Sequence, residues 1–222
     1  MKPARTKQPV FKRDAADLPR DLEPVETPER LFENSDLTEL NENRLQDLDR
    51  PDLRLGTFRM EGCALERVRL AGGHFSSLVW RDVRLTGCDL ANIRAHRVTL
   101  VRVELIDCRL AGFRAADLDG QDVLIQKGDV RYAQFQSGKF RACEFYECNC
   151  QEADFQRADL SGSVFRSCNL GRADLRGAKL QQTDFRGSEV DEMLVGMNDL
   201  QGAIVDAAQA MVFARLLGLH IA

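Results

Sequence analysis

The chain repeats a five-residue pattern of apolar and polar positions from Leu53 to Ala207. Read in steps of five, the third position is apolar in 30 of 31 consecutive steps, and Gly120 is the exception. No charged residue occupies the first or the third position anywhere in this range. A period of five matches neither the two-residue period of a strand nor the 3.6-residue period of a helix. The chain must therefore bend at every fifth residue, with two side chains inside and three outside.

This pattern predicts a square coil with four short faces and 20 residues per turn. Coils stacked through backbone hydrogen bonds would lie about 4.8 Å apart, so about eight coils would form a rod on the order of 38 Å long. Residues 20 positions apart then stack, which predicts an inward aromatic column of Phe145, Phe165 and Phe185.

One stretch of the repeat has unusual inward residues. The third position shrinks to Ala115 and Gly120, while the first position grows to Phe113 and Leu118. Both positions point inward, so this exchange keeps the total core volume. A local slip of the register around residues 113–125 is the alternative interpretation.

Several steps between Ala153 and Gly187 resemble the A(D/N)LXX consensus of the pentapeptide-repeat family, namely ADFQR, ADLSG, CNLGR, ADLRG and TDFRG. The resemblance implies an all-β solenoid, a right-handed quadrilateral parallel β-helix, over residues 53–207. An Asp or Asn in the second position can accept a hydrogen bond from a backbone amide at the turn.

The N-terminal quarter departs from the repeat. Residues 1–26 are charged and punctuated by proline, so we expect a disordered or loosely docked tail. Residues 27–52 are expected to form an N-terminal cap with a short helix around residues 29–33. Leu40, Leu45 and Leu48 would cover the first coil, either from a helix or from a degenerate coil.

The C-terminal end predicts a capping helix. Asp206 is a candidate N-cap for a helix over residues 207–217, Gly218 is its expected stop, and residues 208–222 are assigned to the helix and tail. This end is strongly apolar, which makes it a candidate dimer interface. The residues concerned are Met211, Leu216, Leu217, Leu219 and Ile221.

The segment from Asp199 to Ala222 also resembles the C-terminus of the quinolone-resistance (Qnr) pentapeptide proteins. The matching features are the DLQG sequence at residues 199–202, Asp206, Gln209 and Gly218. This resemblance implies a homodimer joined through the C-termini. It also implies a DNA mimic that binds DNA gyrase or topoisomerase IV and modulates quinolone sensitivity. Those relatives carry loops that are needed for protection, whereas no insertion interrupts the repeat here.

Composition narrows the class of protein. The 222 residues are 44% hydrophobic and 30% charged, which is too apolar for a disordered chain and too charged for a membrane protein. No apolar run is long enough to span a bilayer, and no apolar leader opens the chain, so we expect a cytoplasmic protein without a membrane partner. All seven cysteines fall on inward positions, which favours reduced core residues over disulfides or a metal site.

Charge is distributed unevenly along the rod. Residues 53–112 hold 10 Arg and 6 acidic residues, a net +4, whereas residues 113–222 hold 12 basic and 16 acidic residues, a net −4. The basic half contains a candidate patch for an anion or an acidic partner, formed by Arg54, His74, Arg94, His96, Arg97 and Arg114. The acidic half contains a candidate mimic face, formed by Asp154, Asp174, Asp184, Glu189, Asp191, Glu192 and Asp199.

The inward positions carry no acid, base or nucleophile pair, so the sequence predicts no catalytic residues, no cofactor and no enzyme. We expect a protein-interaction rod that binds a macromolecular partner through its outer faces and does not bind nucleic acid directly. The sequence does not identify the protein partner. A topoisomerase-binding DNA mimic is one alternative, and an adaptor or cargo of a specialised secretion system is another.

Overall fold

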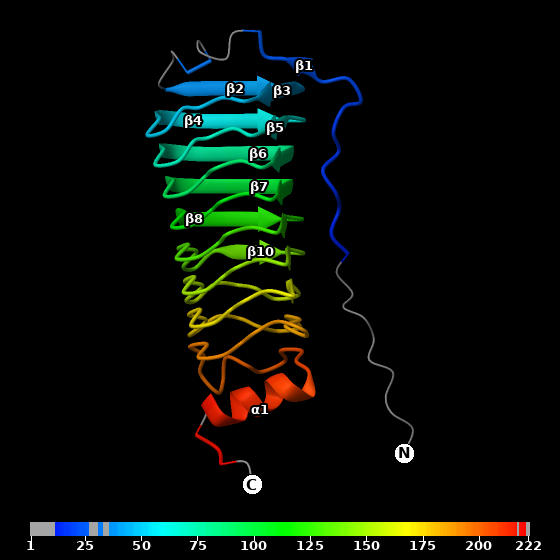
Figure 1. The fold of residues 1–222 in the computed structure, drawn as a ribbon, viewed down its shortest axis with the longest axis vertical. Coiled ribbons are helices and arrows are strands. Elements are labelled where there is room, and N and C mark those ends of the chain that lie inside the picture. Colours follow the sequence, from blue (N-terminus) through cyan, green and yellow to red (C-terminus); the bar gives the residue numbers. More distant parts are fainter. Residues whose placement is uncertain (1–11, 27–30, 33–35, 217, 221–222) are drawn as a thin grey trace.

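A computed structural model describes residues 12–26, 31–32, 36–216 and 218–220. The chain forms a parallel β-solenoid that is closed at its C-terminal end by one helix (Figure 1). In chain order the elements are β1 (Glu23–Pro24), β2 (Leu37–Asn41), β3 (Asn43–Gln46), β4 (Arg54–Glu61), β5 (Ala64–Glu66), β6 (His74–Thr86), β7 (Arg94–Ile106), β8 (Arg114–Gln121), β9 (Leu124–Gln126), β10 (Lys139–Arg141), β11 (Glu144–Tyr146), β12 (Val164–Arg166) and α1 (Ala207–Leu216).

Each coil pairs with the next at an offset of 20 residues. Leu100 pairs with Gly120, and Gly120 pairs with Phe140, so the register runs unbroken through the stretch with unusual inward residues. Phe113 and Leu118 are buried, as the exchange of volumes requires. The alternative of a register slip around residues 113–125 is therefore wrong.

The solenoid starts earlier than the repeat pattern indicates. β2 pairs with β4 and β3 pairs with β5 in the same 20-residue register, so residues 37–52 form a coil. Leu40 and Leu45 are buried inside it. Asn43 and Arg50 occupy positions of the register that point inward in the later coils. Because these two residues are polar, the apolar pattern in the sequence does not extend to the first coil.

At the corners of the coil the backbone adopts the left-handed conformation, with positive φ. The last residue of most five-residue steps has a positive φ, including Asp47 (53°) and Arg67 (53°), a conformation that costs about 1–2 kcal/mol outside glycine. Most of these residues donate their backbone amide to a carbonyl of the next coil, as Asp47 N does to the Glu66 carbonyl at 3.1 Å. These bonds between coils offset the cost of the corner.

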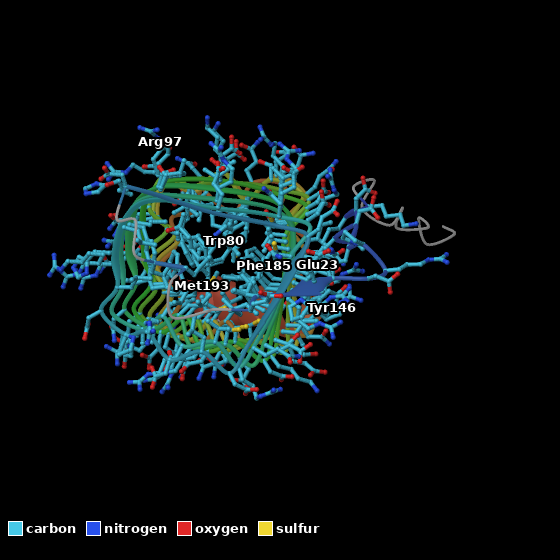
Figure 2. All side chains as sticks on the ribbon, turned by 90° about the horizontal axis from the view of Figure 1, so that it is seen from above. Glu23, Trp80, Arg97, Tyr146, Phe185 and Met193 are labelled. Carbon is cyan, nitrogen blue, oxygen red and sulfur yellow. The ribbon has the colours of Figure 1, made fainter. Side chains whose placement is uncertain are left out.

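The interior is a continuous stack of side chains. Phe145 and Phe165 stack with ring centroids 4.4 Å apart, and Phe165 and Phe185 with centroids 5.4 Å apart, which confirms the predicted aromatic column. Seen along the rod, Trp80, Phe185 and Met193 lie inside the coil (Figure 2).

The cysteines share one role with serine and threonine in this interior. At the first position of a step, the side chain donates a hydrogen bond to the carbonyl 23 residues earlier. Cys148 does so to Ile125 at 3.2 Å, and Thr183 does so to Leu160 at 2.9 Å. All seven cysteines are free and buried, and burial raises the pKa of the Cys143 thiol to about 12. Cysteine is frequent here because the core is narrow and its small side chain can donate to a backbone carbonyl within reach.

The C-terminal helix closes the last coil through a capping box. Asp206 Oδ1 accepts the Gln209 amide and Gln209 Oε1 accepts the Asp206 amide, both at 3.0 Å. The buried Gln209 side chain also donates to the Phe185 and Ser188 carbonyls, and Phe213 packs on the core beneath the helix. The predicted N-cap and capping helix are confirmed.

The N-terminal end has two parts. Phe32 packs edge-on against Phe58 with centroids 5.7 Å apart and helps to cover the first coil, while the helix expected at residues 29–33 lies largely outside the described residues. Residues 12–26, called the arm below, run along the side of the solenoid and join it through the pairing of β1 with β3 (Figure 1). Among the described residues, no helix has the length and apolar character needed to cross a bilayer.

We predict that Gly120→Ala stabilises the protein by about 0.5–1 kcal/mol, because alanine restricts the unfolded chain more than glycine does. Gly120 borders an apolar cavity of about 30 Å³, and an added Cβ would lie 3.5 Å from its nearest neighbours, an ordinary contact. Gly73→Ala is the matched control, because its Cβ would lie 2.7 Å from the Phe75 ring. Urea unfolding of both variants should show opposite signs, and a destabilised Gly120→Ala would contradict this account of the core.

Candidate functional site: a basic groove

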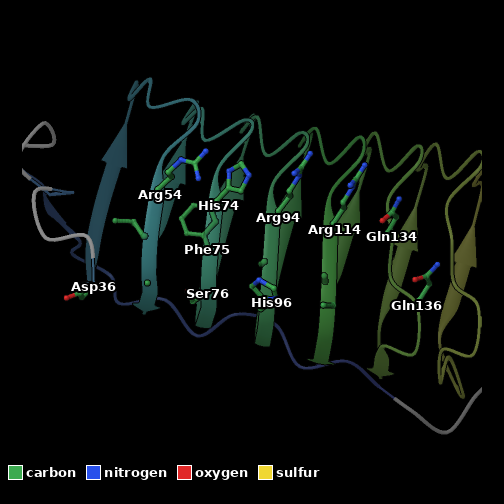
Figure 3. Close-up of a pocket in the computed structure, with 15 residues that line it drawn as sticks. Asp36, Arg54, His74, Phe75, Ser76, Arg94, His96, Arg114, Gln134 and Gln136 are labelled. Atoms are coloured by element: carbon green, nitrogen blue, oxygen red, sulfur yellow. The ribbon is translucent and has the colours of Figure 1, made fainter.

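The 20-residue register places four basic side chains in one outward column. Strand pairing aligns Arg54 with His74, His74 with Arg94, and Arg94 with Arg114. The four residues, called the basic column below, begin strands β4, β6, β7 and β8 and lie side by side on one wall (Figure 3). The column continues into the next coil as Gln134, which bridges to Arg114.

Three small residues and one histidine lie beside the basic column on this wall. Two positions after each basic residue the chain has Gly56, Ser76, His96 and Ala116. Together with the column they line an open groove, called the basic groove below, which extends from Asp36 to Gln134 and Gln136 (Figure 3). The structure thus brings together five of the six residues of the predicted basic patch. Arg97, the sixth, points outward just beside the groove (Figure 2).

The arginines of the basic column keep their charge available. Within the described part of the chain, none of Arg54, Arg94 and Arg114 has a carboxylate within ion-pair distance. Another wall behaves differently, because Asp49, Arg69, Asp89, Arg109 and Asp129 alternate along one column. There Arg69 lies 3.4 Å from Asp49 and 3.8 Å from Asp89. In contrast to that column, the groove presents three arginines and a histidine in line with no acid between them.

His74 adds an unsatisfied atom to the groove. Its Nδ1 is buried and has no hydrogen-bond partner, and only one other described side-chain atom, Trp80 Nε1, shares that condition. A buried polar atom without a partner is uncommon in folded proteins. In a groove, such an atom marks a position that a ligand atom or a water can complete.

The backbone of this wall differs between the two halves of the rod. In the C-terminal coils the equivalent position is Asp, and Asp154 Oδ1 accepts the amide of Gln156 at 2.9 Å. Ser137 and Arg157, at the corners of this wall, are left-handed with φ of 59° and 58°. The matching corner residues Thr57, Ser77 and Arg97 do not have positive φ, and the strands run through them.

The predicted acidic face is not one surface. The register puts Asp154 and Asp174 on the wall of the basic groove, Asp184 on a second wall, and Glu189, Asp191 and Glu192 on a third. Asp184 is fully buried and pairs with Arg166 and Arg186. The Arg176 guanidinium beside Asp174 holds the pKa of that carboxyl below its usual value. Asp199 accepts the amides of Gly177 and Gly196, which makes it a turn cap.

The C-terminal end does expose apolar side chains. Met211 is 47% exposed, Leu216 40% and Leu219 60%, and all three lie on or just after α1. Leu217 and Ile221, the other two residues of the predicted dimer interface, lie outside the described residues.

Comparisons with known proteins agree with the coiled, five-residue repeat architecture. Residues 143–182 match the family model for pentapeptide repeats in eight copies. A solved structure of HetL, a pentapeptide repeat protein involved in heterocyst differentiation regulation from the cyanobacterium Nostoc sp. strain PCC 7120, is 20% identical with a TM-score of 0.51. That alignment covers 80% of this chain and 89% of HetL.

A structure of QnrB1, a plasmid-mediated fluoroquinolone resistance protein, is 16% identical over 82% of this chain and 100% of QnrB1. Its TM-score of 0.28 is too low to support an inference. No curated protein matches the sequence. At these identities the likeness to HetL concerns the fold alone.

Proposed function

We propose that this chain, which belongs to the pentapeptide-repeat proteins, is a non-enzymatic interaction rod whose basic groove binds an extended acidic segment of a protein partner. The observation that carries the proposal is the in-line set of Arg54, Arg94 and Arg114, for which the described residues supply no carboxylate at ion-pair distance. The rod holds these guanidinium groups on neighbouring strands, so the groove is rigid before the partner arrives. Such preorganisation reduces the entropic cost of binding.

An acidic polypeptide fits the groove better than a nucleic acid. Proteins that bind single-stranded nucleic acid combine a basic path with exposed aromatic rings on which bases stack. The only Phe, Tyr or Trp in the described lining of the groove is Phe75, which is buried at 2% exposure. The protein also carries a net charge of −4, which opposes general attraction to phosphate polymers.

We predict that Arg94→Glu weakens the binding of a fluorescein-labelled oligo-glutamate peptide by about tenfold, equivalent to about 1.4 kcal/mol. The new carboxylate would repel the peptide in the middle of the basic column. Fluorescence anisotropy at low salt measures the change. Arg81→Glu is the matched control, because Arg81 lies on the neighbouring strand β6, is exposed, and belongs to the next wall.

An equal loss in Arg94→Glu and Arg81→Glu would show that net charge, and not the groove, determines binding. Labelled single-stranded DNA serves as the second probe in the same titration. Tighter binding of the DNA with the same dependence on Arg94 would replace the acidic polypeptide by a nucleic acid as the ligand.

We also propose that two copies of the rod join through their C-terminal ends. The exposed Met211, Leu216 and Leu219 at the helical end support this, because large apolar side chains gathered at one end are typical of an interface. We predict that the wild type is a dimer in light scattering and that Met211→Asp makes it a monomer. Tyr132→Asp, a change of the same kind on the side of the rod, should leave the dimer intact. A monomeric wild type would contradict the proposal.

Binding to a type II topoisomerase is the second candidate function. The observation that favours it is the similarity of residues 199–222 to the Qnr C-terminus, while the distribution of acidic residues over three walls does not favour DNA mimicry. A gyrase supercoiling assay with and without a quinolone separates the two candidates. We expect neither inhibition nor protection at micromolar protein. Either effect would make the topoisomerase the partner.

A further inference from the structure

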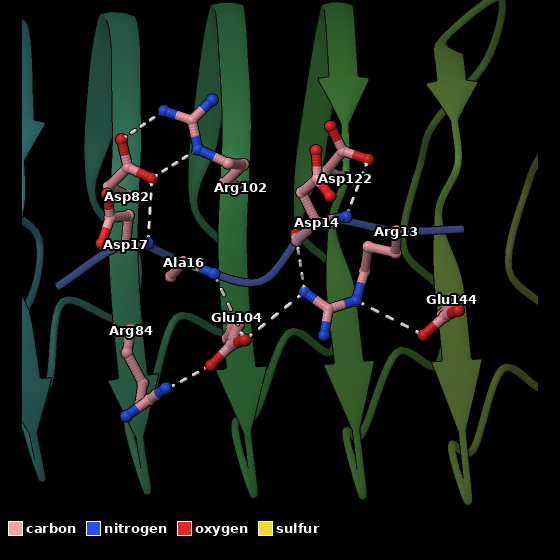
Figure 4. Close-up of polar contacts among 10 residues, drawn as sticks. All are labelled: Arg13, Asp14, Ala16, Asp17, Asp82, Arg84, Arg102, Glu104, Asp122 and Glu144. Atoms are coloured by element: carbon pink, nitrogen blue, oxygen red, sulfur yellow. Dashed lines mark hydrogen bonds and ion pairs between the residues drawn. The ribbon is translucent and has the colours of Figure 1, made fainter. Parts of the chain in front are cut away.

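The arm crosses one coil after another along an outward face of the solenoid (Figure 4). Arg13 reaches Glu144 at 3.3 Å, and the Asp14 amide donates to Asp122 at 3.2 Å. Further along, the Ala16 amide donates to Glu104 at 3.4 Å and the Asp17 amide to Asp82 at 3.0 Å. The arm thus contacts a series of carboxylates that the 20-residue register places in two neighbouring columns.

The carboxylates beneath the arm form a covered acidic stripe, defined here as Asp82, Glu104, Asp122 and Glu144. Asp82, Glu104 and Asp122 are only 8%, 5% and 6% exposed, although they occupy outward positions of the coil. Burial by itself would raise the pKa of Asp82, but hydrogen bonds from Arg102 and from the Asp17 amide hold that pKa below its usual value. Asp82 therefore remains charged beneath the arm at neutral pH.

The arm is held by contacts that many peptides could supply. Three of them are backbone amides donating to carboxylates, and the fourth group is the Arg13 guanidinium, which lies between Glu104 and Glu144. The side chains of Asp14 and Asp17 are exposed and add no contact to the stripe. On the stripe itself, an extended backbone and one arginine supply the four contacts.

We infer that the acidic stripe is a docking site for an extended peptide that carries an arginine, and that the arm occupies this site as a removable strap. The acidic residues alone would not establish a site. The second observation is the arm itself, a peptide segment that lies along the stripe with defined hydrogen bonds (Figure 4). The stripe lies on a different wall from the basic groove, so this inference does not depend on the proposed function.

The tether determines how the strap competes. A segment joined to its site by a short chain has an effective concentration of about millimolar, so a free peptide of the same sequence competes poorly. A partner must therefore either bind more tightly than the arm or meet a chain whose arm has been displaced. The strap would thus raise the peptide concentration that is needed for binding. Charge reversal at Arg13 should lower that concentration.

The test uses the full-length protein with Arg13→Glu, which places a carboxylate between Glu104 and Glu144. The probe is a fluorescein-labelled peptide with the sequence of residues 12–22. We expect the peptide to bind the variant about tenfold more tightly than the wild type, because the arm no longer fills the stripe. Hydrogen exchange should show in parallel that the amides of Asp14, Ala16 and Asp17 lose their protection.

Arg20→Glu is the matched control, since Arg20 is an exposed arm residue that makes no ion pair with the stripe. This variant should retain the amide protection and the weak peptide binding of the wild type. A probe peptide that itself carries Arg13→Glu should not bind. Equal peptide affinity in the wild type and in Arg13→Glu would overturn the inference. So would an absence of binding to both at about 1 mM peptide, or arm amides that are unprotected in the wild type.

Discussion

Every feature of this protein depends on the backbone hydrogen bonds that join one coil to the next. Along the coils they extend from the amide of Glu42, bonded to the Glu61 carbonyl, to the amide of Ile204, bonded to the Thr183 carbonyl. Because each coil uses the amides and carbonyls of its neighbours, all coils must share one length and one set of bends. This constraint keeps charged residues out of the interior and admits cysteine, serine and threonine, whose small donors reach a carbonyl of the preceding coil.

The same constraint turns sequence spacing into surface chemistry. Residues 20 positions apart become neighbours, so the choice of residue in one column decides whether a wall is neutral or charged. On one wall Asp49, Arg69 and Asp89 alternate and neutralise each other. On another, Arg94 and Arg114 follow each other with no acid between them. The rod can therefore change the character of one wall without disturbing the core, because outward columns contribute little to packing.

The arm adds a surface that the repeat does not encode. It runs along the rod axis, across the strands, and each of its contacts reaches a different coil. Its amides bury Asp82, Glu104 and Asp122, which would otherwise be ordinary outward residues. The solenoid thus offers two kinds of surface, the open basic groove and the acidic stripe beneath the arm.

The sequence by itself determined the coil, its register and the inward position of all seven cysteines, because a five-residue period with uncharged inward positions admits one way of burying them. It also placed Arg54, His74, Arg94 and Arg114 in one column, since columns follow from spacing alone. For the first coil the sequence left a helix and a degenerate coil open, because Asn43 and Arg50 interrupt the apolar pattern while the backbone ladder continues through them. Only the tertiary structure showed the docking of the arm, the burial of Asp184 and the lack of ion pairs at the arginines of the basic column among the described residues. These depend on contacts between side chains and on the path of a segment outside the repeat, which no local periodicity records.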